Sequence, residues 1–263
     1  MNKKLQKLYK IINKFNSIVI AYSGGVDSSF LLYICKKLNK KILAVTASSE
    51  IFPTSEVEIA EKFTKKLKIP HIIIKTKQLA NKKFTKNLFN RCFHCKYEIY
   101  RKIQKLKKKL KYDVIFDGTN YDDIKNDIRP GFLAIRKLKV VCPLVEAKFT
   151  KKEIRKLSEK FKIPIWRKFS FSCLASRIPS GEKITKEKLR KVEKAEKIIK
   201  NYIKYVFRVR DHEELARIEV EKDKIKNFII NKNLPSIVKK LKKIGYKYIC
   251  IDIEGYIPSG KRI

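Results

Sequence analysis

The chain has 263 residues and a mass of 31.0 kDa, and its 44% hydrophobic content excludes an intrinsically disordered protein or a small disulfide-held fold. The formal net charge is +39, but 53 of the 65 basic residues are lysines spread through every segment, so the charge alone does not indicate a nucleic-acid partner. The uncharged stretch at residues 17–26 is far shorter than the ~20 apolar residues that span a membrane. Because a signal-peptide pattern is also missing, we expect a soluble, cytoplasmic protein.

Short apolar runs rich in β-branched residues alternate with helical patterns over the first part of the chain. The runs predict five strands, at residues 18–21, 41–46, 71–75, 113–117 and 140–145. Pro53 with Ser55 and Glu58 predicts a helix start, and Thr150 with Glu153 predicts the start of a capped helix. A basic helix is expected over residues 97–110. Strands that alternate with helices at this spacing predict an α/β fold with a doubly wound parallel sheet.

The pattern changes after residue 164. Residues 164–182 are rich in Ser, Pro and aromatic residues, which predicts a long loop and marks a candidate functional segment. The remaining pattern predicts a helix at residues 185–202, strands at residues 206–210 and 216–220, two helices, and a last strand at residues 248–253. We therefore divide the chain into a larger domain at residues 1–165 and a smaller C-terminal α/β domain at residues 166–263.

Residues 23–28 (SGGVDS) form a glycine turn between the first strand and the first helix pattern. Such a turn presents backbone N–H groups and the positive end of a helix to an anion. It is not a Walker A loop, because no Gly-Lys-Ser/Thr follows, and it is not GxGxxG, because Gly24 and Gly25 are adjacent. The simpler alternative is an ordinary tight turn capped by Ser and Asp.

This turn resembles the pyrophosphate-binding loop of the PP-loop ATP pyrophosphatases, doubly wound α/β enzymes that split ATP into AMP and pyrophosphate. The resemblance implies a set of residues that hold the phosphates of ATP: Ser23, Gly24, Gly25, Asp27 and Ser28. It also implies that Asp27 is a partner of Mg²⁺ and that Ala47, at the end of the second strand, lies beside the adenine. A loop that holds the leaving pyrophosphate stabilises the charge that develops as the bond breaks.

Three of the six cysteines stand outside apolar patterns. Cys92 and Cys95 form a single CxxC, and Cys173 lies in the loop at residues 164–182. In a reducing compartment, three such thiols are consistent with an iron–sulfur cluster or another metal, with a redox pair, or with small buried side chains. The second pair that a structural zinc site usually has is missing.

Arginine is scarce, so its positions are informative. None precedes residue 91, and six lie in polar, motif-like settings: Arg91, Arg129, Arg177, Arg208, Arg210 and Arg217. A planar guanidinium suits bidentate contacts with phosphate or carboxylate, which predicts a site for such a group. The alternative is that some of these side chains only cap helices or pair with glutamates.

Several blocks together resemble the LarE family, ATP-dependent sulfur transferases of the PP-loop superfamily. The blocks are RCFHCK (91–96), DGTNYDD (117–123), IRPG (128–131), PLVEAKFTKKEIR (143–155), WRKFSFSCLASRIPSG (166–181) and FRVRDHEELARIEV (207–220). The resemblance implies that a carboxylate of pyridinium-3,5-biscarboxylic acid mononucleotide is adenylated by ATP and then converted to a thiocarboxylate. Adenylation is needed because a carboxylate oxygen is a poor leaving group.

The same resemblance implies roles for individual residues. Cys173 is expected to bear the sulfur, and Cys92, Cys95 and Cys173 together are expected to bind a [4Fe-4S] cluster that relays sulfide. Four residues after the fourth strand are expected near the adenylate: Gly118, Thr119, Asn120 and Asp122. Four arginines are expected to bind substrate: Arg208 and Arg210 its phosphate, Arg129 and Arg177 a carboxylate or AMP. The family forms oligomers, so a homo-oligomer is expected.

Three other functions remain open at this point. A tRNA-thiolating PP-loop enzyme also uses three cysteines and would use the positive charge, although the lysines are not gathered with aromatic residues in one block. An ammonia-using synthetase accounts for the loop but not for the cysteines. A non-catalytic nucleotide-binding protein leaves Cys173 unexplained.

Overall fold

The computed structural model describes residues 2–125, 130–169 and 172–257, and the chain divides into two compact units. Unit 1 comprises Met1–Gln78 and Phe89–Phe171, and unit 2 comprises Leu79–Leu88 and Ser172–Ile263. Unit 2 thus also includes Leu79–Leu88, which the sequence-based division at residues 165 and 166 assigned to the larger domain. Within the described residues, no helix is long and apolar enough to cross a membrane.

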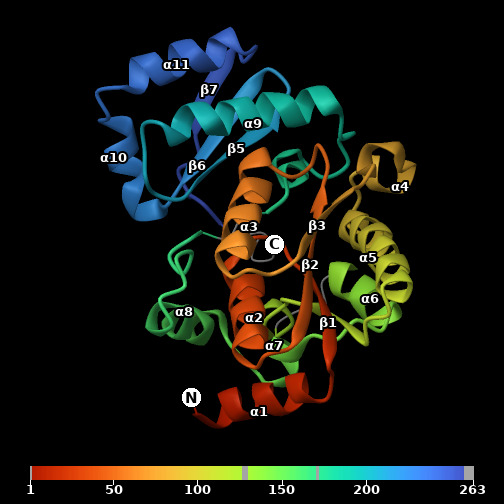
Figure 1. The fold of residues 1–263 in the computed structure, drawn as a ribbon. Coiled ribbons are helices and arrows are strands. Elements are labelled where there is room, and N and C mark those ends of the chain that lie inside the picture. The colour runs from red at the N-terminus through yellow and green to blue at the C-terminus, as the bar shows by residue number, and fades with distance from the viewer. Residues whose placement is uncertain (1, 126–129, 170–171, 258–263) are drawn as a thin grey trace. The chain divides into compact units, whose positions relative to one another are not determined.

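Unit 1 is a parallel sheet with helices on both of its faces (Figure 1). The sheet has the order β3-β2-β1-β4. Its strands are β1 (Ser17–Ala21), β2 (Lys41–Ser48), β3 (His71–Lys75) and β4 (Val114–Asp117). Its helices are α1 (Asn2–Asn13), α2 (Val26–Lys37), α3 (Thr54–Lys66), α5 (Arg91–Lys109), α6 (Pro130–Lys137), α7 (Pro143–Glu146) and α8 (Lys151–Lys160). The predicted doubly wound α/β class is therefore confirmed.

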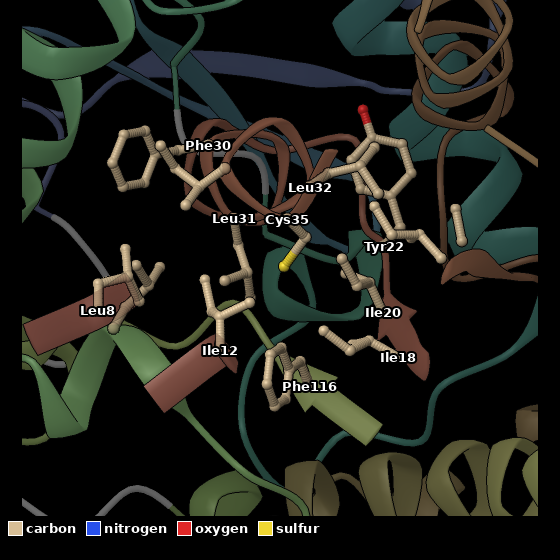
Figure 2. Packing of buried hydrophobic residues seen from close by; sticks show 14 of the residues in the cluster. Leu8, Ile12, Ile18, Ile20, Tyr22, Phe30, Leu31, Leu32, Cys35 and Phe116 are labelled. Carbon is tan, nitrogen blue, oxygen red and sulfur yellow. The ribbon is translucent and has the colours of Figure 1, made fainter. Parts of the chain in front are cut away.

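The alternation of side chains along β1 explains why both faces are covered. Ile18 and Ile20 point into one apolar cluster together with Phe30 of α2 and Leu8 of α1 (Figure 2). Val19 points to the opposite face, where it packs in a second cluster with residues of α5 and α6. In a strand that is buried on both faces, neither set of alternating side chains meets water. This explains why residues 18–21 of β1 are all apolar.

One local prediction is wrong. The fifth strand expected at residues 140–145 is reduced to a single parallel bridge between Val141 and Phe116, because Pro143 cannot donate to a ladder and instead begins α7. The helix start predicted from Pro53, Ser55 and Glu58 is confirmed, since α3 begins at Thr54; Pro53 occupies the capping position and forms no side-chain bond there. By contrast, Thr150 and Glu153 form the predicted capping box at the start of α8.

Unit 2 contains a three-stranded mixed sheet of order β5-β6-β7. β5 (Phe207–His212) runs antiparallel to β6 (Leu215–Val220), and β6 runs parallel to β7 (Tyr248–Ile251). The helices of this unit are α4 (Lys82–Thr85), α9 (Lys186–Lys200), α10 (Ile225–Ile229) and α11 (Leu234–Lys243), with the 3₁₀ turn η3 (Leu174–Arg177). The apolar residues of α9 and α11 pack with Val209 and Ile218 of the sheet, which gives unit 2 a core of its own.

Most helix ends in unit 1 use lysine where glycine is usual. The residues that follow α3, α5, α6, α7 and α8 have positive φ, and all are lysines: Lys68, Lys111, Lys139, Lys148 and Lys162. A Cβ in this left-handed conformation costs about 1 kcal/mol or more, which glycine avoids. The chain has only 8 glycines, and lysine occupies helix ends where its Cβ is unfavourable.

We predict that Lys68→Gly raises the free energy of unfolding by about 1 kcal/mol. The Lys68 side chain is exposed and its φ is 52°, so the change relieves backbone strain and removes no buried contact. Lys62→Gly, at an exposed position inside α3, is the control and should lower that free energy by about 1 kcal/mol. Urea unfolding measures both variants, and equal losses would show that the backbone at Lys68 is not strained.

Candidate functional site

The polar loops of unit 1 lie at the carboxyl edge of its sheet. β1, β2 and β4 are parallel neighbours, so their carboxyl ends meet at one edge. The glycine turn at residues 23–28 follows β1, Ala47 lies near the end of β2, and Gly118 follows β4. In open parallel sheets, ligands bind at this edge, where the chain leaves neighbouring strands in opposite directions.

Gly24 has a backbone conformation that its neighbours require. Its φ is +68°, and an added Cβ would lie 3.0 Å from the carbonyl oxygen of Glu56 and 3.4 Å from the Cβ of Ala60, both in α3. A side chain at this position is thus excluded by conformation and by space. The turn therefore lies directly against the first helical turns of α3.

The serines close the turn on itself. Ser23 Oγ lies 3.1 Å from Ser28 Oγ, and Ser28 Oγ donates to the carbonyl oxygen of Gly25 at 3.2 Å. Gly25 occupies the capping position of α2 and offers no side-chain acceptor to the first N–H groups of the helix. Those N–H groups and the positive end of α2 are thus left to an anion rather than to a capping side chain.

The loop after β4 packs against the same helix start. An added Cβ at Gly118 would lie 2.9 Å from both the Cα and the backbone N of Ser28, so only glycine allows this approach. Asn120 is buried, and its side-chain oxygen accepts a hydrogen bond from the backbone N–H of Asp123 at 3.2 Å. The predicted residues Gly118 and Ser28 are therefore in direct contact, although 90 positions of sequence separate them.

Asp117, at the end of β4, is a buried carboxylate beneath this loop. It accepts hydrogen bonds from the hydroxyls of Tyr100 and Thr119 and from the backbone N–H of Thr119, and Lys96 Nζ lies 3.8 Å away. Burial alone raises the pKa of Asp117, but Lys96 and these donors outweigh it, so the pKa lies below its ordinary value. Asp117 therefore stays charged and fixes the position of Thr119.

Asp27 is bound to a lysine that the sequence did not single out. Its Oδ2 lies 2.5 Å from Nζ of Lys151, the first residue of α8, and the backbone N–H of Lys151 donates to Asp122 at 2.7 Å. Burial raises the pKa of Asp27, and Lys151 opposes the rise. Oδ1 of Asp27 is buried, and the side chain of Asn120 also stabilises this carboxylate. A buried carboxylate beside the turn fits the expected Mg²⁺ partner, because Mg²⁺ binds carboxylate oxygens.

A second lysine reaches the turn from the end of unit 1. Lys168 Nζ donates to the carbonyl oxygen of Gly24 at 3.0 Å and to Glu56 Oε2 at 2.7 Å. Sequence reasoning missed both this lysine and Lys151, because among 53 lysines nothing in the pattern distinguishes them. Ala47 is paired with Ile74 of β3, and the neighbouring Thr46 Oγ1 donates to the carbonyl oxygen of Tyr22 at 2.7 Å.

The CxxC cysteines begin α5, a helix that starts six residues before its expected limit. Cys92 is exposed and Cys95 is half-buried. Residues i and i+3 of a helix share one face, so the two thiols belong to the same side of α5. Among the residues that the structure describes, no three His, Cys, Asp or Glu side chains are gathered in a way that could hold a metal ion, so the expected three-thiolate cluster has no support here.

Cys173, in unit 2, is held by its backbone. It precedes η3, and its carbonyl oxygen accepts from the backbone N–H of Ser176 at 3.0 Å, from Ser176 Oγ at 2.9 Å and from Arg177 Nη1 at 3.1 Å. Arg177 is fully buried and forms a two-bond ion pair with Glu196 of α9. The backbone at Cys173 is thus fixed while its side chain stays half-exposed.

The other arginines expected to bind substrate have the following surroundings. Arg210 is buried, forms a two-bond pair with Glu219 and donates to the carbonyl oxygen of Ser176 at 2.6 Å. Arg208 is buried, and its guanidinium carbon lies 5.1 Å from the ring centroid of Tyr256. Burial and the charge of Arg177 lower the pKa of Arg208. Arg129 lies outside the described residues.

We predict that Gly24→Ala weakens the binding of inorganic pyrophosphate on the order of tenfold, because the new Cβ forces the turn away from Glu56. Gly181→Ala is the matched control, since Gly181 also has positive φ (+87°) but has no atom within 4 Å of an added Cβ. The control should lose stability without losing affinity. Titration calorimetry measures the affinities, and equal losses in the two variants would show that the turn is not the anion site.

Comparison with known proteins identifies the family to which the glycine-turn region is similar. The PP-loop domain family matches residues 1–127. An uncharacterized protein of Synechocystis sp. is 36% identical over 99% of this chain and 97% of its own length. An uncharacterized protein of Methanocaldococcus jannaschii is 35% identical over 96% of this chain and 98% of its own length.

A more distant relative has a described activity. The pyridinium-3,5-bisthiocarboxylic acid mononucleotide synthase of Lactiplantibacillus plantarum is 25% identical over 96% of this chain and 91% of its own length. The glycine turn, the start of α2 and Asp27 all lie within the residues that match the PP-loop domain. Residues 1–127 of the chain therefore belong to the PP-loop ATP pyrophosphatase family.

Proposed function

We propose that this protein is an ATP-dependent sulfur transferase that converts a carboxylate of pyridinium-3,5-biscarboxylic acid mononucleotide into a thiocarboxylate. In the first step a carboxylate oxygen of the substrate attacks the α-phosphorus of ATP. The bond between this phosphorus and the bridging oxygen breaks, and its electron pair leaves with pyrophosphate. The products are an acyl adenylate and pyrophosphate, and the glycine turn of unit 1 binds the pyrophosphate.

The second step transfers sulfur from Cys173. Its thiolate attacks the carbonyl carbon of the acyl adenylate, a C–S bond forms, and AMP leaves with the electrons of the C–O bond. Removal of the Cα proton of Cys173 then breaks its Cβ–S bond. The products are the substrate thiocarboxylate and dehydroalanine at position 173. Mg²⁺, held at Asp27, would supply positive charge beside the phosphates.

The observation that carries this proposal is the setting of Cys173. Three hydrogen bonds converge on its carbonyl oxygen, and a fully buried ion pair anchors one of the donors, while the thiol side chain remains half-exposed. A cysteine that served only to fill a core would be buried, as Cys35 and Cys142 are. The described activity of the Lactiplantibacillus plantarum relative supports the substrate class.

We predict that Cys173→Ala abolishes thiocarboxylate formation and leaves substrate-dependent pyrophosphate release intact, because the thiol acts only after adenylation. Pyrophosphate and thiocarboxylate are measured separately in one reaction. Cys250→Ala, at an exposed cysteine of unit 2, is the control and should keep both. A variant at position 173 that loses both products, or neither, would contradict the proposed role, and pyrophosphate release with unmodified tRNA would favour a tRNA-thiolating enzyme.

The source of the sulfur has its own test. If Cys173 gives up its sulfur, the protein after one turnover should be lighter by one hydrogen sulfide, which intact-mass spectrometry detects. If a cluster bound by Cys92, Cys95 and Cys173 relays sulfide, protein prepared without oxygen should contain about four iron atoms per chain and should keep its mass. Cys92→Ser with Cys95→Ser should stop turnover only in the second case.

A further inference from the structure

The ammonium group of Lys168 is placed at the glycine turn by the fold of unit 1. The hydrogen bond to the Gly24 carbonyl oxygen joins residues that are 144 positions apart. The side chain is only 15% exposed, and its partner Glu56 is equally covered. Two of the three N–H donors of the ammonium are used by Gly24 and Glu56, and no third bond is formed with the described residues.

The segment that carries Lys168 is held by an arginine. Arg155 of α8 donates to the carbonyl oxygen of Trp166 at 2.6 Å and to that of Lys168 at 2.7 Å. One planar guanidinium thereby fixes the backbone on both sides of residue 167. A long side chain that starts from a fixed backbone loses less freedom when it binds a ligand.

The turn needs a positive charge that its own sequence does not provide. A Walker A loop carries a lysine that reaches the outer phosphates, and residues 23–28 have none. Lys151 is paired with Asp27, whereas Lys168 donates to the carbonyl oxygen of Gly24 in the turn. The pyrophosphate that leaves carries the electron pair of the broken bond, so a cation beside it stabilises the leaving group.

We propose that Lys168 binds the β- and γ-phosphate oxygens of ATP and of the released pyrophosphate. Glu56 holds the ammonium beside the turn while the phosphates are absent, and the ammonium shifts from Glu56 to a phosphate oxygen when they bind. The proposal rests on the PP-loop as the phosphate site and does not require the sulfur chemistry. The competing role is a brace, in which the ion pair of Lys168 with Glu56 only shapes the turn.

Two substitutions separate these roles because they act in opposite directions. Lys168→Met removes the cation under either role, so pyrophosphate binding should weaken about tenfold or more. Glu56→Gln removes the competing carboxylate. If Lys168 binds phosphate, this variant binds pyrophosphate as tightly as the unaltered protein or more tightly. If the ion pair is a brace, it binds as weakly as Lys168→Met.

The experiment is titration calorimetry of the full chain with inorganic pyrophosphate and Mg²⁺. Arg167→Met is the matched control, because Arg167 carries the same charge at the adjacent position but is exposed and stacks over Trp166, 4.4 Å from its ring centroid. This control should bind as the unaltered protein does. Circular dichroism establishes that each variant is folded; if Lys168→Met is not, Lys168→Gln takes its place.

The proposal is supported if Lys168→Met loses affinity, Arg167→Met keeps it and Glu56→Gln does not lose it. It is overturned if Lys168→Met binds within about twofold of the unaltered protein, or if Glu56→Gln weakens binding by more than that. These outcomes do not depend on Cys173. A protein that binds pyrophosphate through Lys168 and makes no thiocarboxylate would refute the sulfur transfer alone.

Discussion

The contact on which unit 1 depends is the approach of backbone to backbone around the start of α2. At Gly24 the turn lies against α3, and at Gly118 the loop after β4 lies against Ser28, in each case at a distance that leaves no room for a Cβ. These contacts hold the turn between two neighbouring segments before any ligand arrives. A phosphate site of this kind does not have to be ordered at the moment of binding, so less of the binding energy is lost.

Lysine and arginine form different kinds of contact in the two units. In unit 1, Lys151 and Lys168 each form a single-point contact with a carboxylate at the glycine turn. In unit 2, Arg177 and Arg210 are buried and each forms a two-bond pair with a buried glutamate. Both arginines also bind carbonyl oxygens around η3, so their geometry supports the backbone next to Cys173. In this arginine-poor chain, Arg177 and Arg210 do stand at positions with a distinct requirement, because a planar guanidinium can form two hydrogen bonds to one carboxylate.

Local patterns predicted most of the elements, and the failures have local causes. β1, β2, β3 and β4 all lie where apolar runs predicted them. β1, β2 and β4 are buried, whereas β3 is an edge strand with no fully buried residue. The run at residues 140–145 is also apolar, but Pro143 prevents a ladder and only Val141 forms a bridge. α5 begins at Arg91, because its first turns contain no glycine or proline. The polar CxxC segment has no apolar helical pattern, so the sequence did not predict this earlier start.

The sequence by itself indicated an anion site, because a glycine turn between a strand and a helix presents backbone N–H groups and the positive end of the helix. Gly24, Gly25, Asp27 and Gly118 could be identified because they stand in segments that resemble those of known PP-loop families. Only the tertiary structure decided which cations belong to the site. Lys151 and Lys168 are ordinary members of a lysine-rich sequence, and they become distinctive only when α8 and the segment after it bring them to Asp27 and Gly24. Long-range proximity of a common residue leaves no local pattern, so it can be found only in the folded chain.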